Sequence, residues 1–332
     1  MARRSQPNAL YCTAVCLALA SPVALSAGSA GEAASFPNRP IRIVVGFTPG
    51  GQPDITARLI GPKLYESLKQ QVVVDNRPGA GGVIGTKIVA DATPDGYTLL
   101  SVSAAHVILP SVHSRLSYHP GQDFAGITMT ATASYLLLVS PSSGAKTVQE
   151  LIALARARPG QLNFSSAGTG SGTHFAGEMF KQSAHIDVVH VPYKGVFEAL
   201  TDTMTGRVQF FMAPLASAAP LVKDGKLRAL GVSSLTRVGI FPDVPTLAES
   251  GLPGFRWDSW AGILAPARTP RAIINKLNRE ITRILRLPEI QQRLRALGAE
   301  PAPTTPAEFD KLIAEQLVVV AGLAQKAGIK AQ

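Results

Sequence analysis

A glycine-rich stretch between an apolar strand pattern and a helix pattern is the segment of this sequence best suited to hold a ligand. It runs Ala-Gly-Thr-Gly-Ser-Gly-Thr-His over residues 167–174. Glycine permits positive φ angles and lets a ligand approach the backbone. The first turn of the following helix offers unpaired N–H groups and the positive end of a dipole, and Thr169, Ser171 and Thr173 add hydroxyl groups. Such a turn can bind a carboxylate without an arginine; the alternative is a capped helix start that binds nothing.

A second turn of this kind lies near the start of the chain. Residues 48–53, Thr-Pro-Gly-Gly-Gln-Pro, follow an apolar run and precede a helix predicted from about Asp54 to Leu68. Because like charges repel, we interpret Asp54 as a residue that caps the helix or shapes the loop, not as a direct anion ligand. Two such turns on separate parts of the chain favour a clamp that grips one acid from two sides.

Patterns for nucleotide binding or catalysis are weak. The glycines of residues 79–85 are not in the G-x-G-x-x-G register, and neither glycine turn continues into the Lys-Ser/Thr of a P-loop. The chain has no G-x-S-x-G elbow and no H-E-x-x-H zinc motif. We therefore predict a protein without catalytic residues, metal or cofactor. An exported hydrolase that uses His174 and a serine stays open, because Ser, His and Asp occur in nearly every chain of this length.

The first thirty residues have the layout of a secretory signal peptide. Arg3 and Arg4 precede an apolar segment over residues 9–25, and small residues follow. The alternative is an N-terminal membrane anchor, which Pro22 disfavours. Cys12 and Cys16, the two cysteines of the chain, both lie in this segment, so the mature protein has no thiolate for catalysis or metal binding. We predict export to the periplasm with cleavage near residue 30.

The charge of the chain favours small anions over nucleic acid as partners. Its 332 residues carry a net charge of +10, which removal of the segment 1–30 lowers to about +8. The basic residues are dispersed, except along the last helices, where a solvated helix face is the simpler interpretation. A nucleic-acid binder clusters its charge with aromatic residues or a known motif. A mildly positive surface can still attract anionic solutes.

The elements that must position the two turns alternate between short apolar runs and amphipathic stretches. Strands are predicted at 41–47, 72–74 and 97–102, then at 136–139, 162–164, 188–191, 208–212 and 227–232, with a strand-like segment at 257–264. Helices are predicted at about 54–68, from about 83 to 90, and at 148–157, 173–183 and 197–205, followed by three near the C-terminus at 271–285, 289–297 and 307–325. This order predicts an α/β fold with two Rossmann-like lobes and a central cleft. We expect lobe boundaries at 36–138 with 236–332, and at 139–235.

Five motifs, in order along the chain, resemble those of the Bug-type receptors, the periplasmic solute-binding proteins of tripartite tricarboxylate transporters. They are residues 40–51 with Asp54, 75–82 with Gly85, 167–174, 191–195 and 242–246. The resemblance covers about residues 36 to 329. It implies two lobes that close in Venus-flytrap fashion on a small organic acid and deliver it to integral membrane transporter subunits. A partner of a membrane sensor kinase is the alternative, and a monomer is the expected state of a mobile clamp.

The resemblance also implies the residues of the site. Residues on the first jaw would be Phe47, Thr48, Gly50, Gly51 and Asp54, and residues on the second would be Thr169, Gly170, Ser171, Thr173 and His174, with Tyr193, Lys194 and Gly195 near them. Ser103 and His106, at the end of the third predicted strand, are expected to form a wall. Lys194 is either a source of complementary charge or a surface lysine.

Two departures from the family pattern predict a less polar pocket. Residues 196–199 are Val-Phe-Glu-Ala where the family often has a small residue and Pro-Ala. Ala213 and Pro214 stand where the family often has an acidic or amide residue. We expect both positions to face the cleft. An aromatic or partly apolar carboxylate is then a better ligand than a classical tricarboxylate.

Overall fold

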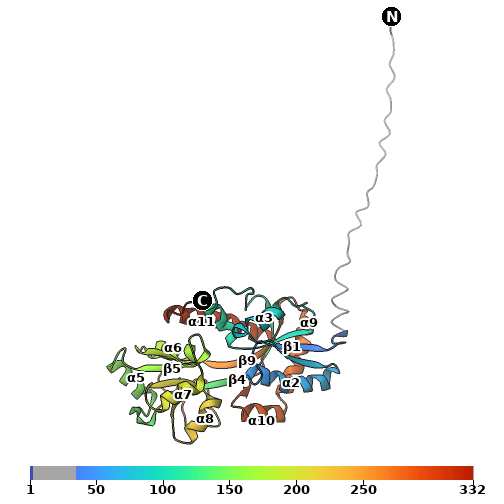
Figure 1. Cartoon of the computed structure of the whole chain (residues 1–332). Coiled ribbons are helices and arrows are strands. Elements are labelled where there is room, and N and C mark those ends of the chain that lie inside the picture. Colours follow the sequence, from blue (N-terminus) through green and yellow to red (C-terminus); the bar gives the residue numbers. More distant parts are fainter. Residues whose placement is uncertain (3–34, 332) are drawn as a thin grey trace.

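The computed structural model describes residues 1–2 and 35–331 of the chain. The predicted signal peptide therefore lies outside the described residues, apart from its first two. In the described part, two α/β halves are joined by the long strands β4 (Phe124–Val139) and β9 (Asp258–Pro266), as Figure 1 shows. No helix among residues 35–331 combines the length and the apolar character needed to cross a membrane.

The first half is a sheet of order β2-β1-β3-β9-β4. Strands β1, β2 and β3 are parallel, whereas β9 is antiparallel to both β3 and β4. The α/β class is thus confirmed, with antiparallel additions that the sequence patterns did not reveal. Besides β4 and β9, the elements of this half are β1 (Ile41–Val45), α2 (Gln52–Leu68), β2 (Val72–Asn76), η1 (Ala80–Gly82), α3 (Val83–Ala90), β3 (Thr98–Ser103), α4 (Ala105–Val112), α9 (Arg271–Leu285), α10 (Pro288–Ala296), β10 (Glu300–Pro301) and α11 (Pro306–Lys326).

Helices cover both faces of this sheet, which explains the apolar run of β1. Helices α2, α9 and α10 pack on one face around residues such as Ile60 and Leu277. Helices α3, α4 and α11 pack on the other around Val107 and Phe309. A parallel strand that is buried on both sides is apolar throughout, and in β1 only Arg42 keeps partial exposure.

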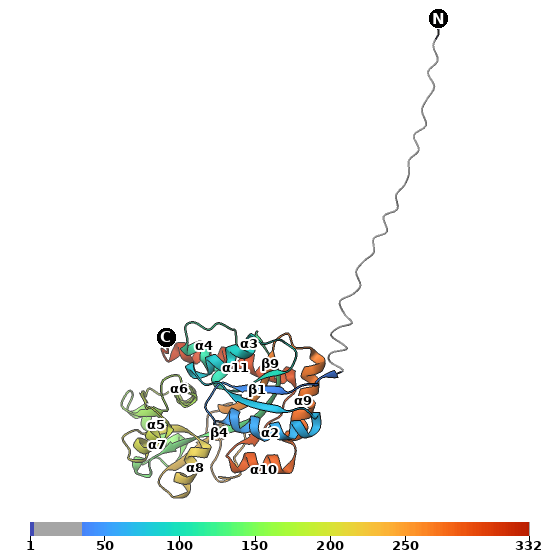
Figure 2. The same cartoon turned by 45° about the vertical axis from the view of Figure 1, so that its right-hand side comes forward.

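The second half is a smaller sheet in which β4, β7, β5 and β6 lie side by side and β8 flanks β4. Strand β5 is parallel to β6 and β7, and β4 is antiparallel to β7 and β8. Figure 2 shows this half beside the first, with α7 and α8 at its lower side and α6 next to the first half. The elements are η2 (Pro141–Ser143), α5 (Val148–Ala157), β5 (Asn163–Ser166), α6 (Gly172–Ala184), β6 (Val189–Pro192), α7 (Val196–Met204), β7 (Phe210–Pro214), α8 (Leu215–Lys223) and β8 (Arg228–Val232).

Strand pairing and packing move the expected lobe boundaries. Residues 124–134 of β4 pair with β9, whereas residues 135–139 pair with β7 and β8. Leu247, Leu252 and Phe255, which we expected in the first lobe, pack in the core of the second half. The first boundary shifts because β4 crosses between the sheets without a turn, so the sequence has no signal there. The second shifts because Thr246 pairs with Val232 of β8 and the residues after it pack on lobe 2. We therefore propose lobe 1 as residues 36–134 with 258–331, and lobe 2 as residues 135–257.

Candidate functional site

The loop between β1 and α2, residues 46–51, is held in shape by Asp54 in the first turn of α2. The Asp54 carboxylate accepts hydrogen bonds from the Gly50 N–H at 3.0 Å and from the Asn76 side-chain amide at 2.9 Å. Arg58, one turn further along the helix, pairs with the same carboxylate at 3.0 Å. Asp54 is only 3% exposed, so its charge is directed at the loop and at Arg58.

The start of α2 presents unpaired N–H groups. Gly51 is the N-cap, and no side chain caps the helix. Within the part of the chain that the structure describes, the N–H groups of Thr48, Gly51 and Gln52 have no hydrogen-bond partner. Gly50 has a φ of 95°, which bends the loop and which glycine adopts without strain. This end of the helix therefore offers donors and a positive dipole to an anion.

We expect replacement of Asp54 by alanine to lower the free energy of unfolding by about 1–3 kcal/mol, because Gly50 and Asn76 lose a buried acceptor. Burial raises the pKa of Asp54, but the hydrogen bonds from Arg58, Gly50 and Asn76 outweigh it and the pKa lies below its ordinary value. The carboxylate is therefore ionised at neutral pH. Urea unfolding at pH 7 measures the effect.

The matched control is Asp91→Ala. Asp91 pairs with Lys87 on an exposed helix face, with the same i,i+4 spacing as Asp54 and Arg58. Exposed pairs contribute about 0–1 kcal/mol, so this variant should keep nearly the full stability. Equal losses in the two variants would show that Asp54 is an ordinary surface charge.

The glycine turn of lobe 2 joins β5 to α6. Ser171 is the N-cap of α6, and its Oγ accepts a hydrogen bond from the His174 N–H at 3.2 Å. Thr173 Oγ1 accepts one from the Ala167 N–H at 2.8 Å. Among the described residues, the N–H groups of Thr169, Gly172 and Thr173 have no partner. The hydroxyl groups thus shape the turn, and these three N–H groups are its free donors.

His174 does not reach the surface of the turn. The residue is 3% exposed in the interior of lobe 2, and its Nδ1 accepts a hydrogen bond from the Gly170 N–H at 3.1 Å. This corrects the expectation that His174 contacts a ligand, and it removes the Gly170 N–H from the free donors. The third residue of a helix points its side chain back over the turn before it, which here is the protein interior.

Tyr193, Lys194 and Gly195 border the glycine turn in different ways. The Tyr193 carbonyl oxygen lies 3.3 Å from the position of a Cβ atom placed on Gly168, but its hydroxyl donates to Asp202 at 2.8 Å. Burial and the Asp202 carboxylate raise the pKa of Tyr193 to about 12. Lys194 is exposed and forms no ion pair with any described residue. Gly195 is the N-cap of α7. Only Lys194 is thus free to move toward a ligand.

Phe47, Ser103 and His106 come together around a small cavity inside lobe 1. Its volume is about 10 Å³, close to the lower limit for one water molecule. His106 lies in the first turn of α4 and does not end β3 as expected, because the chain turns into a helix soon after Ser103. His106 Nε2 donates to the Pro120 carbonyl at 3.0 Å, and Nδ1 has no partner in the described chain. Burial lowers the pKa of His106 to about 4, so the ring is neutral.

A larger cavity, of about 330 Å³, lies between the two lobes. No charged side chain lines it. Lobe 1 contributes the start of α2, the end of α10 and parts of β4 and β9; lobe 2 contributes Tyr135 and the start of α8, which no side chain caps. The lining residues are Gly50, Gln52, Ile55, Thr56, Ala133, Ser134, Tyr135, Pro214, Ala216, Ser217, Ser259, Leu294, Leu297 and Ala299. The cavity thus combines two helix N-termini, several hydroxyl groups and an apolar wall.

Tyr135 links this cavity to the glycine turn. It lines the cavity, and its hydroxyl lies 2.7 Å from the position of a Cβ atom placed on Gly172. Burial raises the pKa of Tyr135 to about 12 even though a hydrogen bond with Ser259 lowers it. Trp257 Nε1 donates to the Gly172 carbonyl at 3.2 Å. The starts of α2, α6 and α8 therefore all lie around the crossing strands.

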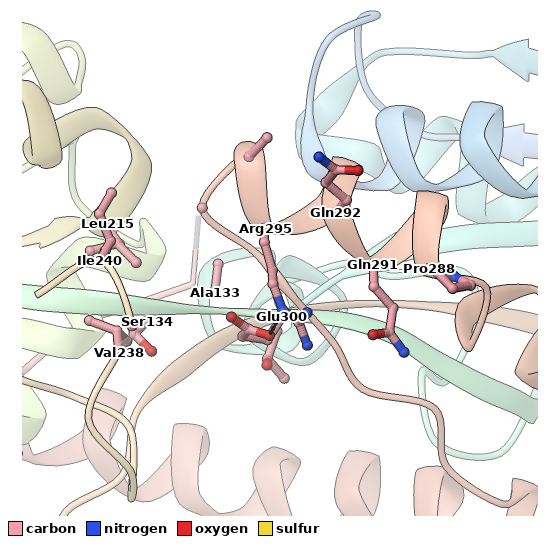
Figure 3. Close-up of a pocket in the computed structure, with 14 residues that line it drawn as sticks. Ala133, Ser134, Leu215, Val238, Ile240, Pro288, Gln291, Gln292, Arg295 and Glu300 are labelled. Carbon is pink, nitrogen blue, oxygen red and sulfur yellow. Dashed lines mark hydrogen bonds and ion pairs between the residues drawn. The ribbon is translucent and has the colours of Figure 1, made fainter. Parts of the chain in front are cut away.

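The lobes also meet in a second hollow of about 600 Å³, which shares Ala133 and Ser134 with the first. Figure 3 shows Val238 and Ile240 of lobe 2 on one side of it and residues of α10 on the other. The ion pair of Arg295 with Glu300, at 3.0 Å, lies between them. The basic charge of Arg295 is therefore already paired within lobe 1.

Ala213 is a further residue that does not lie where it was expected, and several residues that line the cavity were not predicted. Ala213 is fully buried among residues of α7 and α8 and does not face the cleft, because its side chain points to the opposite face of β7 from the one expected. Its neighbour Pro214 lines the cavity. Gln52, Tyr135 and Ser259 were not singled out. Ser217 follows the carboxyl end of β7, a position where ligand contacts are common, and that signal was available.

Comparison with known proteins gives consistent matches over nearly the whole chain. The family model described as "Tripartite tricarboxylate transporter family receptor" matches residues 56–329. The "UPF0065 protein in tcbD-tcbE intergenic region" of Pseudomonas sp. (strain P51) is 40% identical over 273 residues, covering 82% of this chain and 81% of that protein. "Protein BugT" of Bordetella pertussis is 36% identical over 301 residues, covering 90% and 92%. The solved structure of R. palustris Rpa4515 with adipate has a TM-score of 0.73 and 33% identity, covering 90% of this chain and 100% of that one.

Proposed function

This chain belongs to the receptor family of the tripartite tricarboxylate transporters, and we propose that it captures a small organic carboxylate between its lobes in the periplasm and delivers it to integral membrane transporter subunits. The main support for a carboxylate ligand is the inter-lobe cavity of about 330 Å³. Helix N-termini of both lobes meet there, and none of the side chains that line it is charged. A relative of known structure holds adipate, a dicarboxylate.

The cavity can hold an anion by hydrogen bonds alone. The N–H groups of Gly51 and Gln52 are unpaired among the described residues, and they lie at the positive end of α2. Hydroxyl groups of Tyr135, Ser217 and Ser259 surround the same space. Backbone donors at a helix start bind carboxylates and phosphates without a cation.

The remaining wall suits a ligand with an apolar portion. Ile55, Leu294 and Leu297 line the cavity, and Pro214 occupies the place where the family often has an acidic or amide residue. Each buried CH₂ group contributes about 0.8 kcal/mol. We therefore propose that the ligand combines a carboxylate with an aliphatic or aromatic body.

Capture follows from closure of the two lobes about the crossing strands. In the described part of the chain, the backbone passes between the sheets twice: within β4, near Ser134 and Tyr135, and directly before β9, at Asp258. A ligand that contacts both lobes binds the closed form more tightly and shifts the population toward it. The protein then acts as a receptor and leaves its ligand unchanged.

We expect saturating ligand to raise the melting temperature by several degrees. A ligand at about 1,000 times its Kd stabilises the folded state by about 4 kcal/mol. A thermal-shift screen of adipate, hexanoate, benzoate and citrate, each compared with its uncharged amide, measures the effect. The amides keep the shape and lose the charge, so they should give no shift.

Three results would count against the proposal in different ways. Equal shifts with acids and amides would show that the carboxylate is not recognised. Conversion of the acid, followed by chromatography, would identify the exported hydrolase instead. Specific retention of a membrane kinase by the liganded protein, without uptake of the acid in a transporter assay, would support the sensing alternative.

A further inference from the structure

Two buried histidines lie directly behind the glycine turn of lobe 2. The rings of His174 on α6 and His190 on β6 are stacked, with their centres 3.8 Å apart and an angle of 15° between them. His190 stacks in turn on Phe164 of β5, at 4.9 Å. The stack fixes both imidazole rings relative to the sheet of lobe 2.

Each histidine is connected to one glycine of the turn. His174 Nδ1 accepts the hydrogen bond from the Gly170 N–H. His190 Nε2 contacts Ser166 Oγ at 2.6 Å, and this hydroxyl donates to the Gly168 carbonyl and accepts from the Gly168 N–H, both at 3.1 Å. With φ angles of 117° at Gly168 and 79° at Gly170, the turn is tethered at both of its left-handed residues.

The surroundings of the stack keep both rings neutral. Burial lowers the pKa of His174 to about 3, with contributions from His190 and Lys181. Burial and Lys181 lower the pKa of His190 to about 4. Glu178 Oε1 lies 3.9 Å from His174 Nε2, and burial raises the pKa of that carboxyl. A neutral His174 has the lone pair on Nδ1 that the Gly170 N–H requires.

We propose that His174 and His190 are positioning residues that fix the glycine turn in the conformation that presents the N–H groups of Thr169, Gly172 and Thr173 to the ligand. The inference rests on the proposed function and extends its site, because the glycine turn does not line the inter-lobe cavity itself but adjoins it through Tyr135. Neither histidine touches the ligand. Both act through the backbone of the turn, one on each side of the free N–H of Thr169.

The two positions allow a crossed test, because they use different ring nitrogens. In histidine, Nδ1 is bonded to Cγ, as Oδ1 is in asparagine. Histidine Nε2 lies one bond further from Cβ, as do Oε1 and Nε2 of glutamine. His174→Asn and His190→Gln therefore keep the hydrogen bond to the turn, whereas His174→Gln and His190→Asn lose it. All four variants lose the ring stack equally. If the two rings served only to fill space, the same substitution, either Asn or Gln, would be tolerated better at both positions. The proposal instead expects Asn to be tolerated at position 174 and Gln at position 190.

Amide hydrogen exchange of the purified full chain is the first measurement. We expect protection of the Gly170 N–H to fall at least tenfold in His174→Gln and to stay within about threefold of the parent in His174→Asn. Protection of the Gly168 N–H should fall in His190→Asn and persist in His190→Gln. Equal protection in the Asn and Gln variants at each position would overturn the proposal.

Titration with adipate is the second measurement. Its affinity should follow the same crossed order, with losses of at least tenfold in His174→Gln and His190→Asn. Amide protection could follow the crossed order while the affinity for adipate is the same in all four variants. The histidines would then fix a turn that is not part of the site, and the proposal would fail. If the parent protein binds neither adipate nor any other acid of the thermal-shift screen, the proposed function fails, and hydrogen exchange still decides whether the histidines hold the turn.

Discussion

Replacing Gly170 by valine is expected to lower the affinity for an acidic ligand at least hundredfold while the cores of both lobes stay folded. Gly170 has a φ of 79°, a conformation that costs a residue with a side chain about 1–3 kcal/mol, and a β-branched one most. A Cβ atom at this position would also lie 2.6 Å from Cγ1 of Val112, at the end of α4 in lobe 1. Valine must therefore either turn the glycine loop or push the lobes apart. A hundredfold loss corresponds to about 2.7 kcal/mol.

Gly144→Val separates backbone strain from the clash. Gly144 has a φ of 82°, nearly that of Gly170, but nothing lies within 4 Å of an added Cβ atom. This variant should lose a similar amount of stability in urea unfolding and bind adipate as the parent does. The double variant Gly170→Val with Val112→Ala makes room between the lobes and should recover part of the affinity. A Gly170→Val protein that binds as tightly as the parent in calorimetry would exclude the glycine turn from the site.

Much of the fold could be predicted from the sequence, because most of its helices have clear starts and amphipathic patterns. The helices at Val148–Ala157 and Arg271–Leu285 were predicted at the observed bounds. The first begins at Thr147, whose hydroxyl accepts a hydrogen bond from the Glu150 N–H at 3.1 Å. Such local signals need no knowledge of the tertiary structure.

Strand β4 and helix α8 escaped prediction for physical reasons. Strand β4 begins at Phe124, yet only its apolar end at 136–139 was recognised, because the preceding residues are mainly Ala, Thr, Gly and Ser. These small residues let α9 and α11 pack closely on the strand. Helix α8 was missed because Pro220 lies within it and because it follows β7 without any intervening loop.

The candidate site could be predicted as segments but not as an arrangement. Glycine turns before α2 and α6 were recognised from their composition. Which groups of each turn stay free depends on neighbours far away in sequence, such as Asn76 at the first turn and His190 behind the second. The start of α8 joins the site only because β4 places Tyr135 opposite Pro214, and no local pattern encodes that register.

Acid is expected to destabilise this protein strongly between pH 6.5 and pH 4, because three histidines are buried in their neutral form. The pKa values of His106 and His190 are lowered from 6.5 to about 4, and that of His174 to about 3. A lowered pKa in the folded state means that the unfolded chain takes up protons first as the pH falls. The stability is therefore complete above pH 6.5 and is lost as the pH drops toward the folded-state values. His106 alone should contribute about 3 kcal/mol, since one pKa unit corresponds to about 1.36 kcal/mol.

His106→Gln tests this origin of the acid sensitivity. The glutamine amide can still donate to the Pro120 carbonyl, as His106 Nε2 does, but it cannot take up a proton. Urea unfolding of both proteins at pH 7 and pH 4 should show a loss about 3 kcal/mol smaller in the variant. His119→Gln, which removes an exposed imidazole, should lose as much as the parent. If the parent is equally stable at both pH values, or if His106→Gln loses as much as the parent, then His106 is not neutral in the folded protein, and the small cavity beneath the first loop holds a charge.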